Sequence, residues 1–209
     1  MKFIVIVNPH GGKKQGTSLL KKVKPMFDAK GAELFIVETT FAGHARELVN
    51  QIKLDHYDGF IAIGGDGTLH EVVNGMLTRN DHQKIPLGII PGGSGNSFMH
   101  DLELTDPIEA AKAIIQGKIQ AVDTAKIEIN QVTKYAMNMI GWGLVTDVGN
   151  SAEHYRWLGP SRYTILSVIE VLRHKSRAAT LILDDKKIED KFTFIIACNS
   201  IHVGKGMKM

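Results

Sequence analysis

Four short apolar runs alternate with amphipathic segments through the first half of the chain, and this alternation limits the folds open to it. The apolar runs, which are the expected strands, occupy residues 2–7, 32–38, 57–63 and 85–91. Apolar side chains recur at helical spacing over residues 17–29, 43–54, 69–77 and 106–116. Thr105 or Asp106 is expected to cap the last helix, with Pro107 in its first turn. Strands alternating with helices in this way predict a parallel sheet with helices on both faces.

Three of these strands are followed by glycine-rich loops, NPHGG, GGDGT and PGGSGNS, at residues 8–12, 64–68 and 91–97. Ligands of parallel sheets bind beyond the carboxyl ends of the strands, so the loops are expected to share one edge. Glycine lets a ligand approach the backbone closely, and N–H groups at a helix start bind anions. GGDGT lacks the Lys-Ser/Thr pair of a Walker A motif and the spacing of a dinucleotide motif. A site for nucleotide phosphates is therefore predicted at this edge.

Asp66 lies between the glycines of the second loop and could act in three ways. It could cap the helix that follows, hold a Mg²⁺ ion that bridges phosphates, or accept a proton from an attacking hydroxyl. Phosphoryl transfer needs charge neutralisation and a carboxylate that orients the nucleophile. Because a carboxylate is repelled by a polyphosphate unless a cation is present, Mg²⁺ is implied.

The character of the sequence changes near residue 118. Strands, several of them partly alternating between apolar and polar residues, are expected at residues 119–129, 134–140, 178–183 and 191–197. One helix is expected among them, at residues 161–174. This pattern of several strands with a single helix predicts a strand-rich, antiparallel second domain at residues 119–209, after a first domain at residues 1–118.

Composition excludes several classes of protein. A net charge of +3 is too weak to indicate nucleic-acid binding by itself. The single cysteine, Cys198, rules out a disulfide framework and is expected to be a buried strand residue in a reducing compartment. No apolar stretch has the length of a signal peptide's core with its cleavage site or of a membrane span. We therefore expect a soluble, cytoplasmic protein.

Four ordered blocks carry a resemblance to a known family. They are VNPHGG, ETTFAGHARELV, GGDGTLHEVVNG with PGGSGNS, and GWGLVTDVGNSAEHYRWLGPSRY, and together they cover residues 4–163. The first three resemble the catalytic domain of the diacylglycerol kinase and sphingosine kinase superfamily, and the last resembles the lipid-recognition segment of sphingosine and ceramide kinases. The resemblance implies a nucleotide-binding α/β domain and a β-sandwich-like second domain. Members usually continue beyond the strand FTFIIACN, so the second domain is expected to be incomplete in this sequence.

The resemblance also implies roles for single residues. Asp66 would be the catalytic base, and Asp147 would recognise the polar head of a sphingoid lipid. Nucleotide contacts are implied for Asn8, Thr39, His44, Gly64, Gly65, Gly67, Thr68, Gly93, Ser94, Asn96, Arg156 and Arg162. Without the resemblance, His44 is a surface histidine at a helix start and the two arginines form surface salt bridges. His70 and Glu71 are interpreted first as solvated or capping residues, and candidates for an acyl-chain wall are Trp142, Trp157, Leu158 and the helix at residues 161–174.

The resulting hypothesis is an ATP- and Mg²⁺-dependent lipid kinase that transfers the γ-phosphate to a hydroxyl of a sphingoid lipid. Asp147 favours a sphingoid head group over diacylglycerol, which has no cation, but does not separate sphingosine from ceramide. The alternatives are an NAD kinase-type enzyme, which shares the GGDGT turn, and a non-catalytic nucleotide- or lipid-binding fragment. The lipid would be met at a membrane, through peripheral contact.

Overall fold

The computed structural model describes residues 1–11, 14–155, 165–166, 169, 173, 176–202 and 206–209. By the contacts between its residues, the chain divides into two compact units. Unit 1 contains Met1–Asn138 and Asn199–Met209, and unit 2 contains Met139–Cys198. The boundary expected at residues 118/119 lies inside unit 1, and that division into domains stays a prediction.

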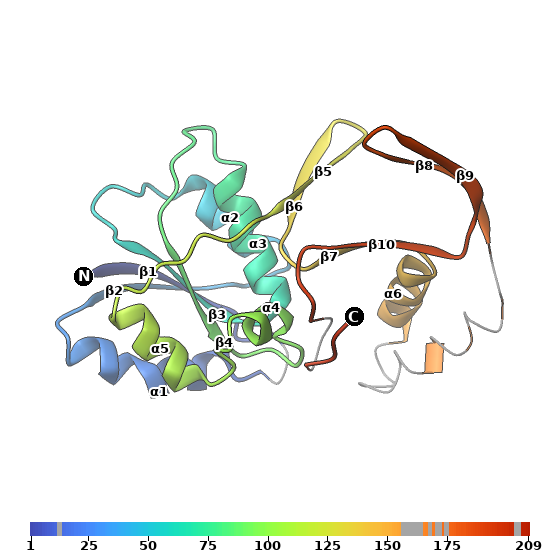
Figure 1. Cartoon of the computed structure of the whole chain (residues 1–209). Helices are drawn as coiled ribbons and strands as arrows, with labels where there is room; N and C mark the ends of the chain where they lie inside the picture. The colour runs from blue at the N-terminus through green and yellow to red at the C-terminus, as the bar shows by residue number, and fades with distance from the viewer. Residues whose placement is uncertain (12–13, 156–164, 167–168, 170–172, 174–175, 203–205) are drawn as a thin grey trace. The chain divides into compact units, whose positions relative to one another are not determined.

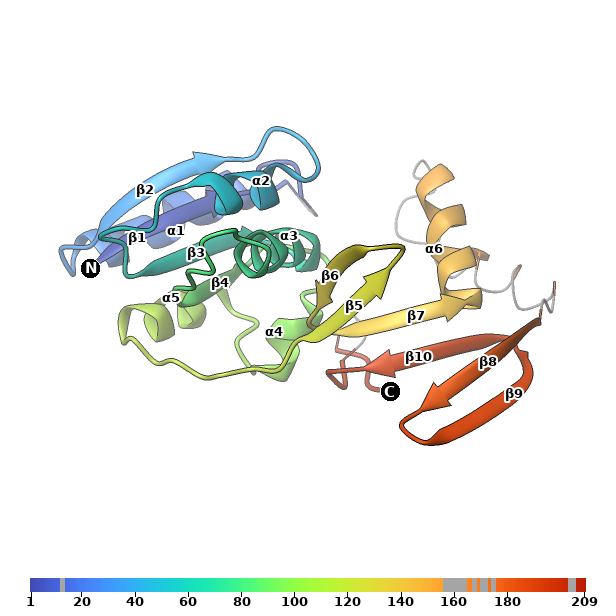
Figure 2. The same cartoon turned by 90° about the horizontal axis from the view of Figure 1, so that it is seen from above.

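A four-stranded parallel sheet forms the centre of unit 1, as the sequence predicts. Its strands are β1 (Lys2–Val7), β2 (Glu33–Glu38), β3 (Gly59–Gly64) and β4 (Leu87–Pro91). The strand order is β2-β1-β3-β4, and each neighbouring pair is parallel. Figure 2 shows the strands running in one direction, so that their carboxyl ends reach the same edge.

Helices cover both faces of this sheet. They are α1 (Gly16–Asp28), α2 (His44–Gln51), α3 (Asp66–Leu77), α4 (Ser97–Asp101) and α5 (Pro107–Ile115). Successive side chains of a strand point to opposite faces, so Val5 packs with residues of α1 and α5 while Ile4 packs with residues of α2 and α3. Figure 1 shows α1 and α5 on one side of the sheet and α2 and α3 on the other. The predicted two-sided coverage is therefore confirmed.

The start of the last helix of unit 1 tests the local predictions. Asp106 caps α5, because its carboxylate accepts hydrogen bonds from the backbone N–H groups of Ile108 at 2.8 Å and Glu109 at 3.0 Å. Pro107 is the first residue of that helix, where its missing N–H costs nothing. The short helix α4, directly after the third glycine loop, was not predicted from the sequence.

The remaining part of unit 1 is an antiparallel hairpin and a returning segment. The hairpin pairs β5 (Ala125–Ile129) with β6 (Val132–Ala136). The segment after residue 198 bonds back to it, since Asn199 Nδ2 donates to the carbonyl oxygens of Asp123 at 2.9 Å and Met137 at 2.8 Å. The bond to Met137 lies just past the end of β6, where the single strand expected at residues 134–140 is interrupted.

Unit 2 is strand-rich, as predicted, but contains an unexpected helix. Its elements are β7 (Met139–Gly143), α6 (Leu144–His154), β8 (Arg177–Leu183), β9 (Lys186–Phe192) and β10 (Phe194–Cys198). β7 pairs antiparallel with β10, and β8 with β9. The strand expected at residues 191–197 divides at Thr193, whose carbonyl accepts a hydrogen bond from the backbone of Leu144 at 3.0 Å. The helix expected at residues 161–174 falls mainly outside the described residues.

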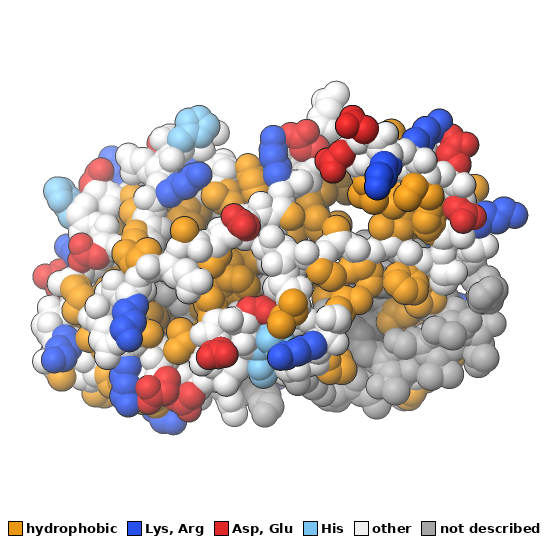
Figure 3. Space-filling model, in the orientation of Figure 1, with side chains coloured by type: hydrophobic (Ala, Val, Ile, Leu, Met, Phe, Trp, Pro, Cys, Tyr) orange, Lys and Arg blue, Asp and Glu red, His pale blue; other side chains and the backbone are white. Residues whose placement is uncertain are grey.

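Several side chains of unit 2 are more exposed than the sequence suggested. Cys198 lies on β10 as expected, but it is exposed, so the prediction of a buried cysteine is wrong. On the β8–β9 hairpin, Ile182 and Ile188 are exposed among charged neighbours, and Figure 3 shows the mixture. No helix among the described residues is both long and apolar enough to cross a membrane.

Candidate functional site

The second and third glycine loops touch backbone to backbone at the carboxyl edge of the sheet. The backbone N–H of Gly92 donates to the carbonyl of Gly64 at 2.8 Å. A Cβ atom on Gly65 would lie 2.8 Å from the Cα of Gly93, and one on Gly93 would lie 2.4 Å from the Cα of Gly65. Since real Cβ atoms do not approach so closely, both positions require glycine for packing. The expected meeting of these loops is confirmed.

The first loop joins them through Asn8 and Thr68. Asn8 Nδ2 donates to Thr68 Oγ1 at 3.0 Å, and Asn8 Oδ1 accepts from the backbone N–H of His10 at 3.0 Å. Thr68 is buried and packs against Gly64: a Cβ atom added to Gly64 would lie 2.4 Å from the Oγ1 of Thr68. All three loops are therefore tied together, and in this structure the polar atoms of Asn8 and Thr68 bond to the protein itself.

Asp66 lies one residue past the cap of α3. The N-cap residue is Gly65, in an extended conformation and with no side-chain cap, so a capping role for Asp66 is wrong. Its half-buried carboxylate instead points toward the third loop, where Ser97 Oγ donates to Oδ2 at 3.4 Å. A Cβ on Gly95 would lie 2.9 Å from the same oxygen. A negative charge in the first turn also interacts favourably with the helix dipole.

The backbone around Asp66 offers an anion site. The backbone N–H groups in the first turn of α3 have no partner within the helix, because each helical N–H bonds to the carbonyl four residues earlier. Such N–H groups can bind an anion. A Cβ on Gly67 would meet no described atom within 4 Å, so this side of the loop is open. Asn96 shapes the opposite loop in the left-handed conformation, accepting from the Gly93 N–H at 2.9 Å and donating to the Gly93 carbonyl at 3.0 Å. Ser94 is exposed at the tip of that loop.

Thr39 and His44 follow β2 at the same edge. Thr39 is buried, and its backbone N–H donates to the carbonyl of Val7 at 2.8 Å. His44 begins α2, and its Nδ1 accepts from the backbone N–H of Thr40 at 3.1 Å. The imidazole stacks on the ring of Phe41 with 4.6 Å between centroids. The histidine ring is thus held in one orientation by these two contacts.

Glu71 caps a helix other than its own. From α3, its carboxylate accepts from the backbone N–H groups of Gly43 at 2.8 Å and Ala45 at 3.1 Å, at the start of α2. Glu71 is therefore a capping residue, but of α2 and not of the helix it belongs to. His70, one residue earlier, has its pKa lowered by desolvation and then by the positive charge of Lys134. Glu71 therefore ties α3 to the start of α2, whereas His70 is exposed.

Asp147 lies in unit 2, in the first turn of α6, with 26% of its side chain exposed. Arg177 Nη2 donates to both of its carboxylate oxygens, at 2.7 and 3.0 Å. The residues Arg156, Arg162, Trp157 and Leu158 lie outside the described residues, so their predicted roles stay predictions. Sequence reasoning did not single out Arg177, which is 30 positions from Asp147, or Ser97, which is 31 positions from Asp66.

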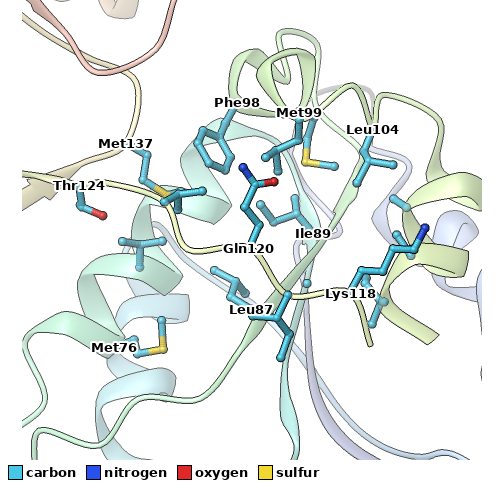
Figure 4. A pocket seen from close by; sticks show the side chains of 18 of the residues that line it. Met76, Leu87, Ile89, Phe98, Met99, Leu104, Lys118, Gln120, Thr124 and Met137 are labelled. Atoms are coloured by element: carbon cyan, nitrogen blue, oxygen red, sulfur yellow. The ribbon is translucent and has the colours of Figure 1, made fainter. Parts of the chain in front are cut away.

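Unit 1 also contains an apolar pocket of about 840 Å³ beside β4. Figure 4 shows Leu87 and Ile89 of β4, Phe98 and Met99 of α4, and Met76 of α3 around it. None of the site residues expected from the sequence lines this pocket. It is therefore separate from the glycine-loop site, although α4 contributes to both.

Comparison with known proteins supports the assignment of the fold and the loops. The family model for the diacylglycerol kinase catalytic domain matches residues 2–127. Sphingosine kinase 1 of Arabidopsis thaliana is 36% identical over 182 residues, which are 82% of this chain and 37% of that protein. Human ceramide kinase is 30% identical over 197 residues, which are 86% of this chain and 37% of that protein.

A solved structure agrees in fold. That of a diacylglycerol kinase from Bacillus anthracis str. Sterne superposes with a TM-score of 0.76 at 27% identity, covering all of this chain and 67% of the other. This chain spans a little over a third of the length of the curated relatives named above. Since the matched segment includes β1 to β4 and all three glycine loops, the chain belongs to the diacylglycerol kinase catalytic domain family.

Proposed function

We propose that this chain is the catalytic part of an ATP-dependent lipid kinase that phosphorylates a hydroxyl of a sphingoid lipid. The observation that carries the proposal is Asp66, a carboxylate that caps no helix and faces the junction of two glycine loops. Family membership supports a kinase that uses ATP, and the relatives at 30–36% identity include sphingosine and ceramide kinases.

The nucleotide phosphates would bind at the open side of the second loop. There the free N–H groups of the first turn of α3 supply donors and a partial positive charge. The glycines at positions 65 and 93 keep the two loops in contact, so the donors are held in place before the ligand arrives. This arrangement would position the phosphates, which is the main demand of phosphoryl transfer.

Asp66 would act on the lipid hydroxyl. The hydroxyl oxygen attacks the γ-phosphorus, the bond from that phosphorus to the β–γ bridging oxygen breaks, and the hydroxyl proton passes to the carboxylate. Ser97 donates to Oδ2 of Asp66, and Oδ1 would be the oxygen that takes the proton. The serine therefore orients the base in this proposal.

Mg²⁺ fits the residues of this edge. Within the described part of the chain, no three His, Cys, Asp or Glu side chains are grouped so that they could hold a metal. Mg²⁺ commonly completes its shell with phosphate oxygens and water, so the phosphates of bound ATP would supply most of its ligands here while Asp66 acts on the hydroxyl. When bound, the ion neutralises charge on the phosphates.

The sphingoid preference rests on Asp147, with ceramide and diacylglycerol as alternatives. We further propose that the protein is cytoplasmic and meets its lipid through peripheral membrane contact. An NAD kinase-type activity is the second enzymatic candidate, because it needs only the glycine loops and Asp66. A nucleotide- or lipid-binding protein without turnover is the remaining alternative.

The test is transfer of labelled phosphate from ATP to sphingosine, ceramide, diacylglycerol and NAD in mixed micelles containing Mg²⁺. We expect label in a sphingoid lipid, and loss of at least a thousandfold in Asp66→Asn with ATP binding kept. Asp55→Asn, which changes an exposed carboxylate of unit 1, is the matched control and should behave like the parent. Label only in NAD, or in none of the four, would refute the lipid kinase, and full activity in Asp66→Asn would remove the base.

A further inference from the structure

Unit 2 contains a cluster of three side chains from three different elements. Trp142 lies on β7, Asp147 in the first turn of α6, and Arg177 at the start of β8. One nitrogen of Arg177, Nη2, donates to both carboxylate oxygens of Asp147, at 2.7 and 3.0 Å. The guanidinium carbon lies 5.9 Å from the centroid of the Trp142 ring system. The carboxylate expected to bind a cationic head group thus already holds a cation of the protein.

We infer that Arg177 determines the specificity of the head-group site, and that the Asp147–Arg177 pair selects a neutral, N-acylated sphingoid lipid over the free amine. This inference rests on the lipid kinase function proposed above and names the substrate class of the same site.

The charge of the pair is the first argument. An isolated, half-buried carboxylate attracts an ammonium group, and a like charge nearby opposes it. With Arg177 in contact, the pair has no net charge, and an incoming amine meets the guanidinium as well as the carboxylate. An amide carries no charge, so it encounters neither attraction nor repulsion of this kind. The pair therefore removes the advantage that a cationic sphingoid base would otherwise have.

The free hydrogen-bonding groups of the pair are the second argument. A carboxylate has about four acceptor positions, and Nη2 uses only one on each oxygen of Asp147. Arg177 Nη1 is buried and has no hydrogen-bond partner among the described residues. A buried donor without a partner is rare and costly. An amide supplies what is missing on both sides, because its N–H can bond to Asp147 and its carbonyl can bond to Nη1.

Trp142 is the third argument, because it keeps Arg177 in position. A guanidinium within about 6 Å of an indole centroid is attracted by the negative face of the ring. Moving Arg177 aside to expose Asp147 to an amine would lose this contact as well as the salt bridge. The cluster therefore favours the paired arrangement when a ligand binds.

The test measures binding of a long-chain sphingoid amine and of its N-acetylated, neutral counterpart. Both are offered to the 209-residue chain in detergent micelles without nucleotide, and the ratio of their dissociation constants is determined. We expect the parent to bind the N-acetylated lipid at least as tightly as the amine. Arg177→Gln should shift the ratio about tenfold toward the amine, because it exposes the charge of Asp147.

Two further variants separate charge from folding. Arg177→Lys keeps the cation but loses the Nη1 donor, so it should keep the amine disfavoured and weaken binding of the N-acetylated lipid severalfold. Lys187→Gln removes a cation from the same hairpin, at an exposed pair with Glu189, and should leave the ratio unchanged. The inference is overturned if the parent prefers the amine tenfold or more, or if Arg177→Gln leaves the ratio where it was. It is also overturned if neither lipid binds.

Phosphorylation of the same two lipids distinguishes this inference from the proposed function. If the binding ratio shifts as expected but neither lipid is phosphorylated, the kinase proposal fails and the role of Arg177 stands. If a lipid is phosphorylated and its binding ratio does not depend on Arg177, only the inference fails.

Discussion

Asn74 offers the sharpest test of how unit 1 is held together, because this buried amide joins α3 to the hairpin that follows the sheet domain. The residue is 4% exposed. Asn74 Nδ2 donates to the carbonyl oxygens of His70 at 2.8 Å and Tyr135 at 2.9 Å, and Oδ1 accepts from the Tyr135 N–H at 2.8 Å. Both backbone groups of Tyr135 therefore depend on one side chain.

Replacing Asn74 with alanine leaves the N–H and the carbonyl of Tyr135 without that partner. Each unsatisfied buried group costs about 1–3 kcal/mol. Because Tyr135 is partly accessible to water, we expect each of its two groups to cost an amount near the lower end of that range. We expect Asn74→Ala to lower the free energy of unfolding by about 2–3 kcal/mol. That is a large share of the roughly 5–15 kcal/mol typical of a domain.

The assay is urea unfolding followed by circular dichroism, with Asn80→Ala as the matched control at an exposed position of the same region. The control should change the unfolding free energy by less than about 0.5 kcal/mol. Hydrogen exchange gives an independent measurement, since the Tyr135 amide should lose protection in Asn74→Ala. A change below about 1 kcal/mol with an unchanged urea dependence would refute the reasoning that the amide bridges the two elements.

Two other changes probe the site and its surroundings. Gly93→Ala should force the second and third loops apart, because its Cβ would lie 2.4 Å from the Cα of Gly65, and it should lower the stability in thermal unfolding by about 1–3 kcal/mol. Gly67→Ala is the control and should not lower the stability, because the space around Gly67 is open. Equal stabilities of the two variants would contradict the close contact. The pKa of Asp81 is lowered to about 2, first by its hydrogen bond from the Arg79 side chain. A lowered folded-state pKa stabilises the fold above the ordinary value and loses this effect as pH falls. The deficit of Asp81→Asn against the parent in urea unfolding should therefore be constant near neutral pH and shrink between pH 4 and pH 2, whereas a constant deficit would refute the ion pair.

The sheet and its loops follow from local physics that can be recognised in a sequence. Fully buried strands need uninterrupted apolar residues, as in β1, and helices on both faces need apolar residues at helical spacing, as in α1 and α3. Parallel strands then bring the loops after them to one edge, whatever the remaining chain does. Short-range rules also predict the capping of α5 by Asp106, because the capping carboxylate and the N–H groups that donate to it are three residues apart or fewer.

Tertiary contacts decided what the side chains at the edge do. Glycine loops of identical sequence could pack apart, and only the approach of Gly65 to Gly93 explains why both lack a side chain. Capping is one of the three roles that the sequence leaves open to Asp66, but the turn makes Gly65 the cap and leaves the carboxylate facing Ser97. Arg177 meets Asp147 across 30 positions, where no periodicity or motif relates the two. Sequence alone determined that the glycine loops share one edge, because strands alternating with helices form a parallel sheet. The partner of each carboxylate depends on long-range packing, which brings together residues that no local pattern connects.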